Sequence, residues 1–260
     1  MANLAFHQET VTLLRSILER RSIRHFTKRP VSEKLLRLIV RAGQRAPTSC
    51  GAQFYNFIEI KDLKKRRAII ALLGKNQTLE SASVWIFICC DVARPLKLFE
   101  ALNTDCYLGE VTGLLHSVID ASLAAQNMVV AAENLGLGSV FTIYHWKALT
   151  EISKLLNLPS RTLPLLLLCI GYPDEKPPLR PRWKIDIVLH SNRYIPPTVK
   201  TMLSDYGRAN EILVNMKYFR RDVGSLSENW ERKFASREMI LREKKLRMEL
   251  QKLGFLPKRL

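Results

Sequence analysis

The chain has 260 residues, of which 47% are hydrophobic, so it can bury a large core and does not belong to the disordered proteins. Its formal net charge is +17, but no basic run is interleaved with aromatic residues and no nucleic-acid-binding motif is found, which argues against specific nucleic-acid binding. The five cysteines form no C-x-x-C pair, which argues against a disulfide framework or a zinc site. We expect reduced core residues at Cys50, Cys89, Cys90, Cys106 and Cys169.

The sequence also argues against a membrane-spanning or secreted protein. Its longest apolar run, Leu163 to Ile170, is far shorter than the roughly 18 residues that a helix needs to cross a bilayer. The N-terminal residues include His7, Gln8 and Glu9, where a signal peptide would be apolar. We therefore expect a cytoplasmic protein.

The first predicted helix leads into a strongly basic segment. Residues 8–19 place apolar side chains on one face, which predicts an amphipathic helix. Residues 20–26, here called the basic segment, follow it and carry Arg20, Arg21, Ser22, Arg24 and His25. Guanidinium groups match phosphate and carboxylate oxygens geometrically, so the segment predicts an anion-binding site. A solvated basic turn is the alternative.

The next helix leads into a loop of small polar residues. Ser32 is a suitable N-cap, and an apolar stripe from Leu35 to Val40 predicts a helix that ends before Ala46-Pro47. Residues 48–53, here called the polar loop, then supply hydroxyls, a thiol, a glycine and an amide. Small polar residues let the backbone approach a ligand closely, although a plain helix-to-strand connection is also possible.

The middle of the chain alternates strands and helices. Residues 54–60 read as a strand and residues 64–73 as an amphipathic helix, which Gly74 ends. Residues 84–90 are apolar without alternation, as in a central strand covered on both faces. Residues 95–110 are weakly helical and then irregular.

A long helix is predicted for residues 111–135, capped by Gly136 and, because it is apolar nearly all round after Val118, buried in the core. Residues 139–143 read as a short strand. His145 follows beside aromatic residues, where an imidazole can either pack or donate a proton.

Residues 149–156 predict a helix and residues 165–170 another strand. The proline-rich residues 177–182 must be extended, so Arg180 and Arg182 point the same way and form either a second anion clamp or a solvated linker.

After residue 197 the chain becomes polar and basic. Residues 211–218 and 231–253 can form helices, but their apolar stripes are narrow. Such an arm needs a surface to pack on. We therefore expect two parts, a domain over residues 1–197 and a basic C-terminal arm over residues 198–260.

Five stretches, in register, resemble the FMN-dependent nitroreductase superfamily, and residues 220–222 extend the likeness to its oxygen-insensitive NADPH nitroreductase / NADPH–FMN oxidoreductase branch. They are residues 20–26, 46–53, 135–140, 168–173 and 179–182. The resemblance runs from about Arg15 to Pro257 and implies an α+β fold, in which helices flank a central, mostly antiparallel sheet and the first domain binds FMN. It also implies a homodimer with FMN at the subunit interface.

The resemblance assigns the FMN contacts to Arg20, Arg21, Ser22, Arg24, Thr48, Ser49, Cys50, Gln53, Gln77, Thr142, Ile143, Tyr144, Arg180 and Arg182. It places the NADPH phosphate near Lys217, Arg220 and Arg221.

The chain departs from the family pattern in four places. A family arginine shortly before Arg220 and Arg221 is absent, which bears on the preference for NADPH. The family usually has serine or asparagine at Cys50 and Gly51, and more often lysine at Arg180. The family branch has a Gly-Gly pair where Ile143, Tyr144 and His145 stand, so either these residues narrow the flavin pocket or the flavin sits differently.

The implied activity is hydride transfer from NAD(P)H, with NADPH favoured, to nitroaromatics, quinones or free flavin by a ping-pong mechanism. It requires no catalytic side chain and no metal, since the flavin carries the chemistry. Two alternatives remain at this point: a flavin reductase with one physiological acceptor, and a basic protein that binds nucleic acid or membrane on a disused flavoenzyme scaffold.

Overall fold

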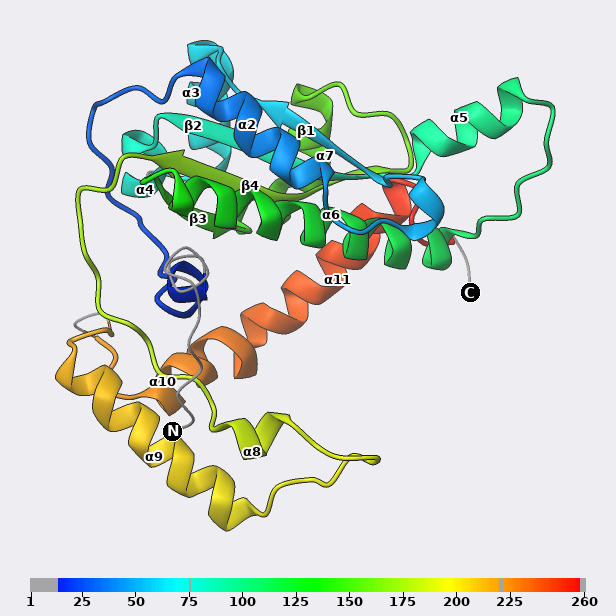
Figure 1. Cartoon of the computed structure of the whole chain (residues 1–260). Helices are drawn as coiled ribbons and strands as arrows, with labels where there is room; N and C mark the ends of the chain where they lie inside the picture. The colour runs from blue at the N-terminus through cyan, green and yellow to red at the C-terminus, as the bar shows by residue number, and fades with distance from the viewer. Residues whose placement is uncertain (1–13, 75, 220–221, 258–260) are drawn as a thin grey trace. The chain divides into compact units, whose positions relative to one another are not determined.

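The computed structural model describes residues 14–74, 76–219 and 222–257, apart from the side chain of Tyr144. The chain divides into two compact units (Figure 1). Unit 1 contains residues 1–177 and 244–260, and unit 2 contains residues 178–243.

A four-stranded sheet forms the centre of unit 1. Its strands are β1 (Tyr55–Glu59), β2 (Val84–Asp91), β3 (Gly138–Thr142) and β4 (Thr162–Gly171), in the order β1-β2-β4-β3. All three pairings are antiparallel. Every residue of β2 is buried, as its continuous apolar run predicts for a central strand. The predicted α+β fold is confirmed.

Helices cover both faces of this sheet (Figure 1). They are α2 (Glu33–Gln44), α3 (Leu63–Leu73), α4 (Gln77–Ser81), α5 (Ala93–Ala101), α6 (Glu110–Asn134) and α7 (Leu149–Leu155), together with helical residues 14–18. The β2 side chains alternate between two apolar clusters. Ile86 and Ile88 pack in one cluster with α2 and α6, and Trp85 and Phe87 pack in the other with α3 and α7.

Most predicted boundaries lie close to the observed ones. The Ser32 hydroxyl caps α2 by accepting a hydrogen bond from the Leu35 N–H. Gln77, expected in a loop, instead begins α4, because the Asn76 side chain caps that helix. Residues 8–13 of the first predicted helix lie outside the described residues.

The cysteines only partly match the prediction of five core residues. Cys89, Cys90 and Cys169 are buried, and burial raises the pKa of Cys90 and Cys169 to about 12. Cys106 is half-buried. Cys50 is exposed because it lies in a turn of the polar loop.

The prediction that α6 is buried in the core is correct for one face of the helix and wrong for the other. Its inner face packs against α2 and the sheet. Its outer face carries four exposed apolar residues, here called the α6 stripe: Val111, Leu115, Ile119 and Leu123. By length and composition α6 is also the one described helix that could cross a membrane, with 39% of its apolar window buried. Its inner contacts make it a core helix of unit 1.

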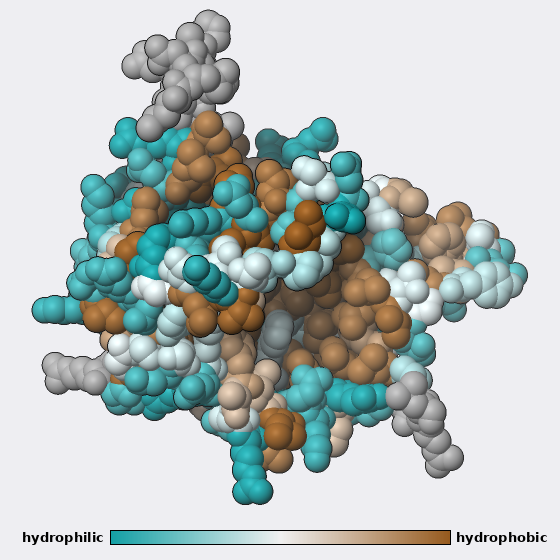
Figure 2. All heavy atoms as spheres, turned by 90° about the horizontal axis from the view of Figure 1, so that it is seen from below, coloured by the Kyte–Doolittle hydropathy of each residue, from teal (hydrophilic) through white to brown (hydrophobic). Residues whose placement is uncertain are grey.

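The chain between α5 and α6 projects from the sheet (Figure 1). Residues 102–109, which connect the two helices, are irregular, as predicted. Leu98 and Leu102 are exposed on this projecting part of the chain. The view from below in Figure 2 shows further hydrophobic surface as brown patches.

Unit 2 is mostly helical. It contains α8 (Ile185–Val188), α9 (Val199–Asn215), α10 (Leu226–Trp230), a π-helical turn (Glu231–Ala235) and the start of α11 (Arg237–Lys252). The helix predicted for residues 211–218 overlaps the end of α9, which begins at Val199, where Thr198 caps it, and already ends at Asn215. The helix predicted for residues 231–253 is interrupted at Ser236, whose backbone is extended.

The end of α11 returns to unit 1 and completes its core. Phe255 is fully buried. The Glu249 carboxylate is also buried and accepts hydrogen bonds from the N–H (2.8 Å) and the hydroxyl of Thr150, at the start of α7. The Arg161 N–H donates to the Leu253 carbonyl at 2.8 Å.

Candidate functional site

The basic segment is fixed to the edge of the sheet where β3 pairs with β4. The Ile23 N–H donates to the Ser139 carbonyl at 3.0 Å. Two glycines make room for the segment: a Cβ on Gly138 would lie 2.8 Å from Ile23, and one on Gly171 would lie 2.9 Å from Phe26. The backbone of the segment therefore has a defined place on unit 1.

The first two arginines of the segment are only loosely paired. Arg20 lies 3.8 Å from the Glu133 carboxylate, and the Arg21 Nη2 lies 4.0 Å from that of Glu19. Both arginine side chains are about one-fifth exposed. Arg21 also donates from Nε to the Glu19 carbonyl at 3.0 Å and from Nη1 to the Pro177 carbonyl at 3.1 Å. A guanidinium has five N–H donors, so these contacts leave donors for an anionic ligand.

Two carboxylates that sequence reasoning missed support the segment. Glu175 accepts hydrogen bonds from the backbone N–H groups of Arg24 and His25, the latter at 3.1 Å. Burial raises the pKa of Glu133, although Arg20 acts in the opposite direction. Neither carboxylate stands out in the sequence, because each lies more than a hundred residues from the segment it supports.

Arg24 itself is folded back toward the chain. Its Nη1 donates to the Ser22 carbonyl at the long distance of 3.4 Å. The Arg24 carbonyl in turn accepts from the Ser81 hydroxyl, also at 3.4 Å. The weak bond of the guanidinium would be exchanged easily for charge-assisted bonds to a phosphate.

The polar loop has an unusual backbone. Three of its residues have positive φ: Cys50 (49°), Gly51 (69°) and Gln53 (52°). Residues other than glycine adopt this region at a cost in free energy. A Cβ on Gly51 would have no heavy atom within 4 Å, so a ligand can approach the backbone there.

A buried carboxylate on α6 holds the inner side of the loop. The Asp120 carboxylate accepts hydrogen bonds from the Thr48 hydroxyl, from the Ser49 N–H (3.1 Å) and from the Phe54 N–H (3.1 Å). The Thr48 hydroxyl also accepts from the Gln53 N–H at 2.8 Å. Sequence reasoning missed Asp120 because it lies in a helix that reads as apolar.

An arginine holds the outer side of the loop. The Arg94 Nη2 donates to the carbonyls of Gln53 and Tyr55, the latter at 2.8 Å. Arg94 lies in the first turn of α5, where the Asp91 carboxylate accepts its backbone N–H at 3.0 Å. No sequence pattern pointed to this contact.

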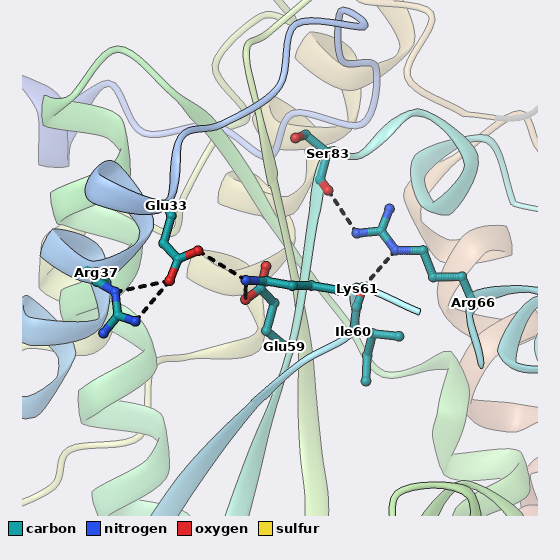
Figure 3. A network of polar contacts seen from close by, with 7 residues as sticks. All are labelled: Glu33, Arg37, Glu59, Ile60, Lys61, Arg66 and Ser83. Carbon is teal, nitrogen blue, oxygen red and sulfur yellow. Dashed lines mark hydrogen bonds and ion pairs between the residues drawn. The ribbon is translucent and has the colours of Figure 1, made fainter. Parts of the chain in front are cut away.

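The two elements that the loop connects are joined to each other by charged residues (Figure 3). At the start of α2, Glu33 pairs with Arg37 (2.9 Å) and with Lys61 (3.4 Å), which follows β1. Lys61 also pairs with Glu59 at 3.2 Å. These exposed pairs add little stability singly but connect the far ends of α2 and β1.

Two cavities flank the polar loop. One, of about 660 Å³, is lined by Arg41, Arg45, Thr48, Gly51 and Gln53, among others. The other, of about 990 Å³, lies between α2 and β1 and shares Arg41 and Gln53 with the first. The loop thus has open space beside it, as a ligand-binding loop requires.

His145 packs in the core and does not face a ligand. Its Nε2 forms a 2.7 Å hydrogen bond with the Pro164 carbonyl, and its ring packs edge-on against Phe87 at 5.3 Å. Burial lowers its pKa to about 4. The packing interpretation of His145 is confirmed, and its burial contradicts a role as proton donor. That residues 143–145 narrow the flavin pocket stays a prediction.

The other predicted contacts near β3 and α4 vary in exposure. Thr142 is buried at the end of β3, and Ile143, which follows it, is half exposed. The side chain of Tyr144 lies outside the described residues. Gln77 is exposed at the start of α4.

Arg180 and Arg182 belong to unit 2, whereas the basic segment belongs to unit 1. Arg180 stacks over the Tyr218 ring at 4.4 Å, and Arg182 donates to the Arg180 carbonyl at 3.3 Å. That these arginines meet the basic segment at one phosphate stays a prediction. Lys217 is exposed, and Arg220 and Arg221 lie outside the described residues.

These residues fit FMN in the chemistry of their donors. The basic segment offers guanidinium groups whose ion pairs are long and whose other bonds, to backbone carbonyls, leave N–H donors over, which suits a phosphate monoester. The polar loop offers hydroxyl, amide and backbone groups beside open space, which suits a flavin ring and its ribityl chain.

Comparison with known proteins gives a consistent result. The pattern of the Nitroreductase family matches residues 17–172. The oxygen-insensitive NADPH nitroreductase of Salmonella typhimurium is 35% identical over 207 residues, which are 79% of this chain and 84% of that protein. The FMN reductase (NAD(P)H) of Bacillus subtilis is 30% identical over 247 residues, 94% and 97% of the two chains.

Among solved structures, the NADPH:FMN oxidoreductase from Vibrio harveyi, complexed with NAD+, superposes with a TM-score of 0.78 and 25% identity. The match covers 91% of this chain and 97% of that one.

Proposed function

Because the chain belongs to the nitroreductase family, we propose that it is an FMN-dependent oxidoreductase that transfers two electrons from NAD(P)H to nitroaromatic compounds or to flavin. The names of its relatives support NADPH as the donor. Quinones as further acceptors and ping-pong kinetics are part of the proposal.

The observation that carries the proposal is the long ion pairing of Arg20 and Arg21. Both side chains are mostly buried, yet their carboxylate partners lie 3.8 and 4.0 Å away. A buried or half-buried charge is stable only with good partners, so the site is suited to a stronger anion than the carboxylates present. The FMN phosphate is such an anion.

The residues of the chain bind and orient the cofactor. Arg20, Arg21 and Arg24 hold its phosphate, with Arg180 and Arg182 as further candidates. Ser22, Ser49 and Gln53 form hydrogen bonds with the flavin, and Thr48, Cys50, Gln77, Thr142, Ile143 and Tyr144 line its surroundings. The chemistry supplied by bound FMN is two-electron transfer, received from NAD(P)H as a hydride and passed to the acceptor.

We propose that the enzyme is a homodimer. The exposed α6 stripe is an unpaired apolar surface on a core helix, which a second copy can cover by two-fold packing. FMN binding at the interface of the two subunits is part of the same proposal.

The other parts of the proposal concern the arm and the location. Residues 1–197 are proposed to act as the FMN-binding domain, and residues 198–260 as a basic arm that packs on the body or on the partner subunit. Lys217, Arg220 and Arg221 are proposed to hold the NADPH phosphate. The protein is proposed to be cytoplasmic.

The test is reconstitution with FMN followed by reduction. Purified protein loaded with FMN should be yellow, should bleach anaerobically with NADPH, and should regain its colour when a nitrofuran, a quinone or free FMN is added. Comparable rates on several acceptors support a broad nitroreductase, and a rate on one acceptor alone supports a specialised reductase. A protein that stays colourless after reconstitution contradicts the proposal.

A further inference from the structure

We propose that Asp120 and Arg94 are positioning residues that together clamp the polar loop in the shape that receives the flavin. This inference rests on the proposed function. The two residues act on opposite sides of the loop and on opposite kinds of backbone group. Asp120 accepts from its N–H groups, and Arg94 donates to its carbonyls.

The role of Asp120 follows from its burial. Its side chain is 1% exposed, and no ion pair with it is found within the described part of the chain. All three donors to its carboxylate come from the loop or the residue after it. A buried carboxylate is costly without such donors, so the carboxylate and the loop shape stabilise each other.

The role of Arg94 follows from its two acceptors. It bonds the carbonyl of Gln53, which has positive φ, and that of Tyr55, the first residue of β1. About half of its side chain is exposed. Arg94 thus fixes the point where the polar loop leads into β1. Because Arg94 belongs to α5, it also connects that helix to the start of β1.

The loop needs this support because its backbone is unfavourable. Cys50, Gly51 and Gln53 all have positive φ, and two of them are not glycine. Without the clamp, the loop would relax toward ordinary backbone angles. Ser49, Cys50 and Gln53 would then no longer be held in place for the cofactor.

Asp120→Asn tests the inner half of the clamp. An asparagine has one carbonyl oxygen, whereas the loop presents N–H groups to both carboxylate oxygens. In either orientation of the amide, its NH2 group faces the N–H of Ser49 or of Phe54, so two donors meet and one hydrogen bond is lost. We expect FMN binding to weaken by about tenfold or more, and the visible circular dichroism of bound flavin to change.

The matched control is Ser117→Ala. Ser117 is fully buried on the same helix, about one turn before Asp120, and its hydroxyl donates to the Leu114 carbonyl instead of the loop. This variant loses a buried polar group of α6 but keeps the clamp. We expect lower thermal stability with less than about a twofold change in FMN affinity.

Arg94→Gln tests the outer half on a half-exposed side chain, so it should fold even if Asp120→Asn does not. We expect FMN binding to weaken by about three- to tenfold. Arg67→Gln is its control, because the Arg67 Nε also donates to a backbone carbonyl, that of Leu63, but on α3. The control should bind FMN as the wild-type protein does.

The measurements are the dissociation constants for FMN, from flavin fluorescence, and the melting temperatures of the flavin-free proteins. The inference is supported if Asp120→Asn and Arg94→Gln lose affinity and their controls do not. It is overturned if Arg94→Gln binds FMN as tightly as the wild-type protein. It is also overturned if Asp120→Asn and Ser117→Ala lower the melting temperature equally and lose the same FMN affinity. If the wild-type protein fails to bind FMN, the proposed function fails and the inference falls with it.

Discussion

The basic segment and the polar loop are two halves of one proposed site, but they are built in different ways. The basic segment carries its ligand groups on long side chains with weak partners, such as Arg20 with Glu133 at 3.8 Å. The polar loop carries its ligand groups on short side chains and backbone, and its shape depends on Asp120 and Arg94. The first half is defined by its residue types, and the second by its conformation.

This difference predicts which part of the cofactor each half recognises. A cluster of arginines should recognise charge, so it should distinguish FMN from riboflavin, which lacks the phosphate. A shaped loop should recognise the flavin ring and the ribityl chain, so it should affect both ligands equally. The variants below are ordered by the expected size of their effect on flavin binding.

The largest effect is expected from the double variant Arg21→Ala/Arg24→Ala. Removing two guanidinium groups should weaken FMN binding about a hundredfold or more, since each charge-assisted hydrogen bond contributes about 1.5–3 kcal/mol. Riboflavin binding should be unchanged. Titration with both ligands measures the ratio.

The control for this variant is Arg29→Ala, which also removes positive charge. Arg29 stacks over Tyr172 at 3.9 Å, just after the basic segment. If Arg29→Ala weakens FMN binding as much, general electrostatic attraction by the +17 chain explains the result, and the proposed clamp is misplaced.

A smaller effect is expected from Ser49→Ala in the polar loop. This variant removes one hydroxyl but keeps the backbone N–H that donates to Asp120. FMN and riboflavin should both bind about threefold to tenfold more weakly, as for one lost hydrogen bond. If only FMN bound more weakly, the polar loop would not recognise the flavin ring and the ribityl chain as expected.

A small effect in the opposite direction is expected from Glu133→Gln. Without the carboxylate near Arg20, FMN should bind about twofold to fivefold more tightly, because the phosphate has one competitor fewer. Glu80→Gln on the exposed surface of α4 is the control, since it changes the net charge equally. Unchanged FMN affinity in Glu133→Gln would show that Arg20 does not contact the phosphate.

Glu133 also gives a prediction about pH. Burial raises the pKa of this carboxyl in the folded protein. At pH values between its ordinary pKa and the raised one, the folded state therefore holds more protons than the unfolded state. Stability from this group is therefore lost as pH rises through that range. Urea unfolding of flavin-free protein should show a weaker fall with pH in Glu133→Gln.

The smallest effect on flavin binding is expected from His145→Gln, because the imidazole is fully buried and bonded to the Pro164 carbonyl. The folded-state pKa of about 4 lies below the ordinary 6.5, so the unfolded state binds the extra proton first. Stability from this group is complete above 6.5 and is lost as the pH falls toward about 4. Thermal melts over this range should show a weaker decline in the variant, with FMN affinity unchanged.

Much of the fold could be predicted from residue patterns. The apolar run of β2 and the cap at Ser32 both appear as predicted, because burial and capping depend on local residue types. The exposed α6 stripe could not be predicted, because Leu115 and Ile119 do not differ in type from core residues. The start of α9 was missed, although Thr198 caps it and Val199, Met202 and Leu203 lie at helical spacing.

The site shows the same limit. The ligand groups were predicted by resemblance, and they lie on both units, with Arg180 and Arg182 on unit 2 and the basic segment and polar loop on unit 1. The supporting residues could not be predicted, because Asp120 meets the loop only through the tertiary fold, 66 residues from Phe54 in the sequence. Arg94 is one of many arginines, and nothing local marks it.

The return of α11 to unit 1 has a consequence for the order of events during synthesis. Phe255 and Glu249 complete a core whose other residues are made first. While the ribosome is still translating residues 178–243, unit 1 lacks this final piece, and its apolar surface stays open. A nascent chain that stalls before Phe255 should therefore depend on chaperones, however complete its cofactor-binding residues are.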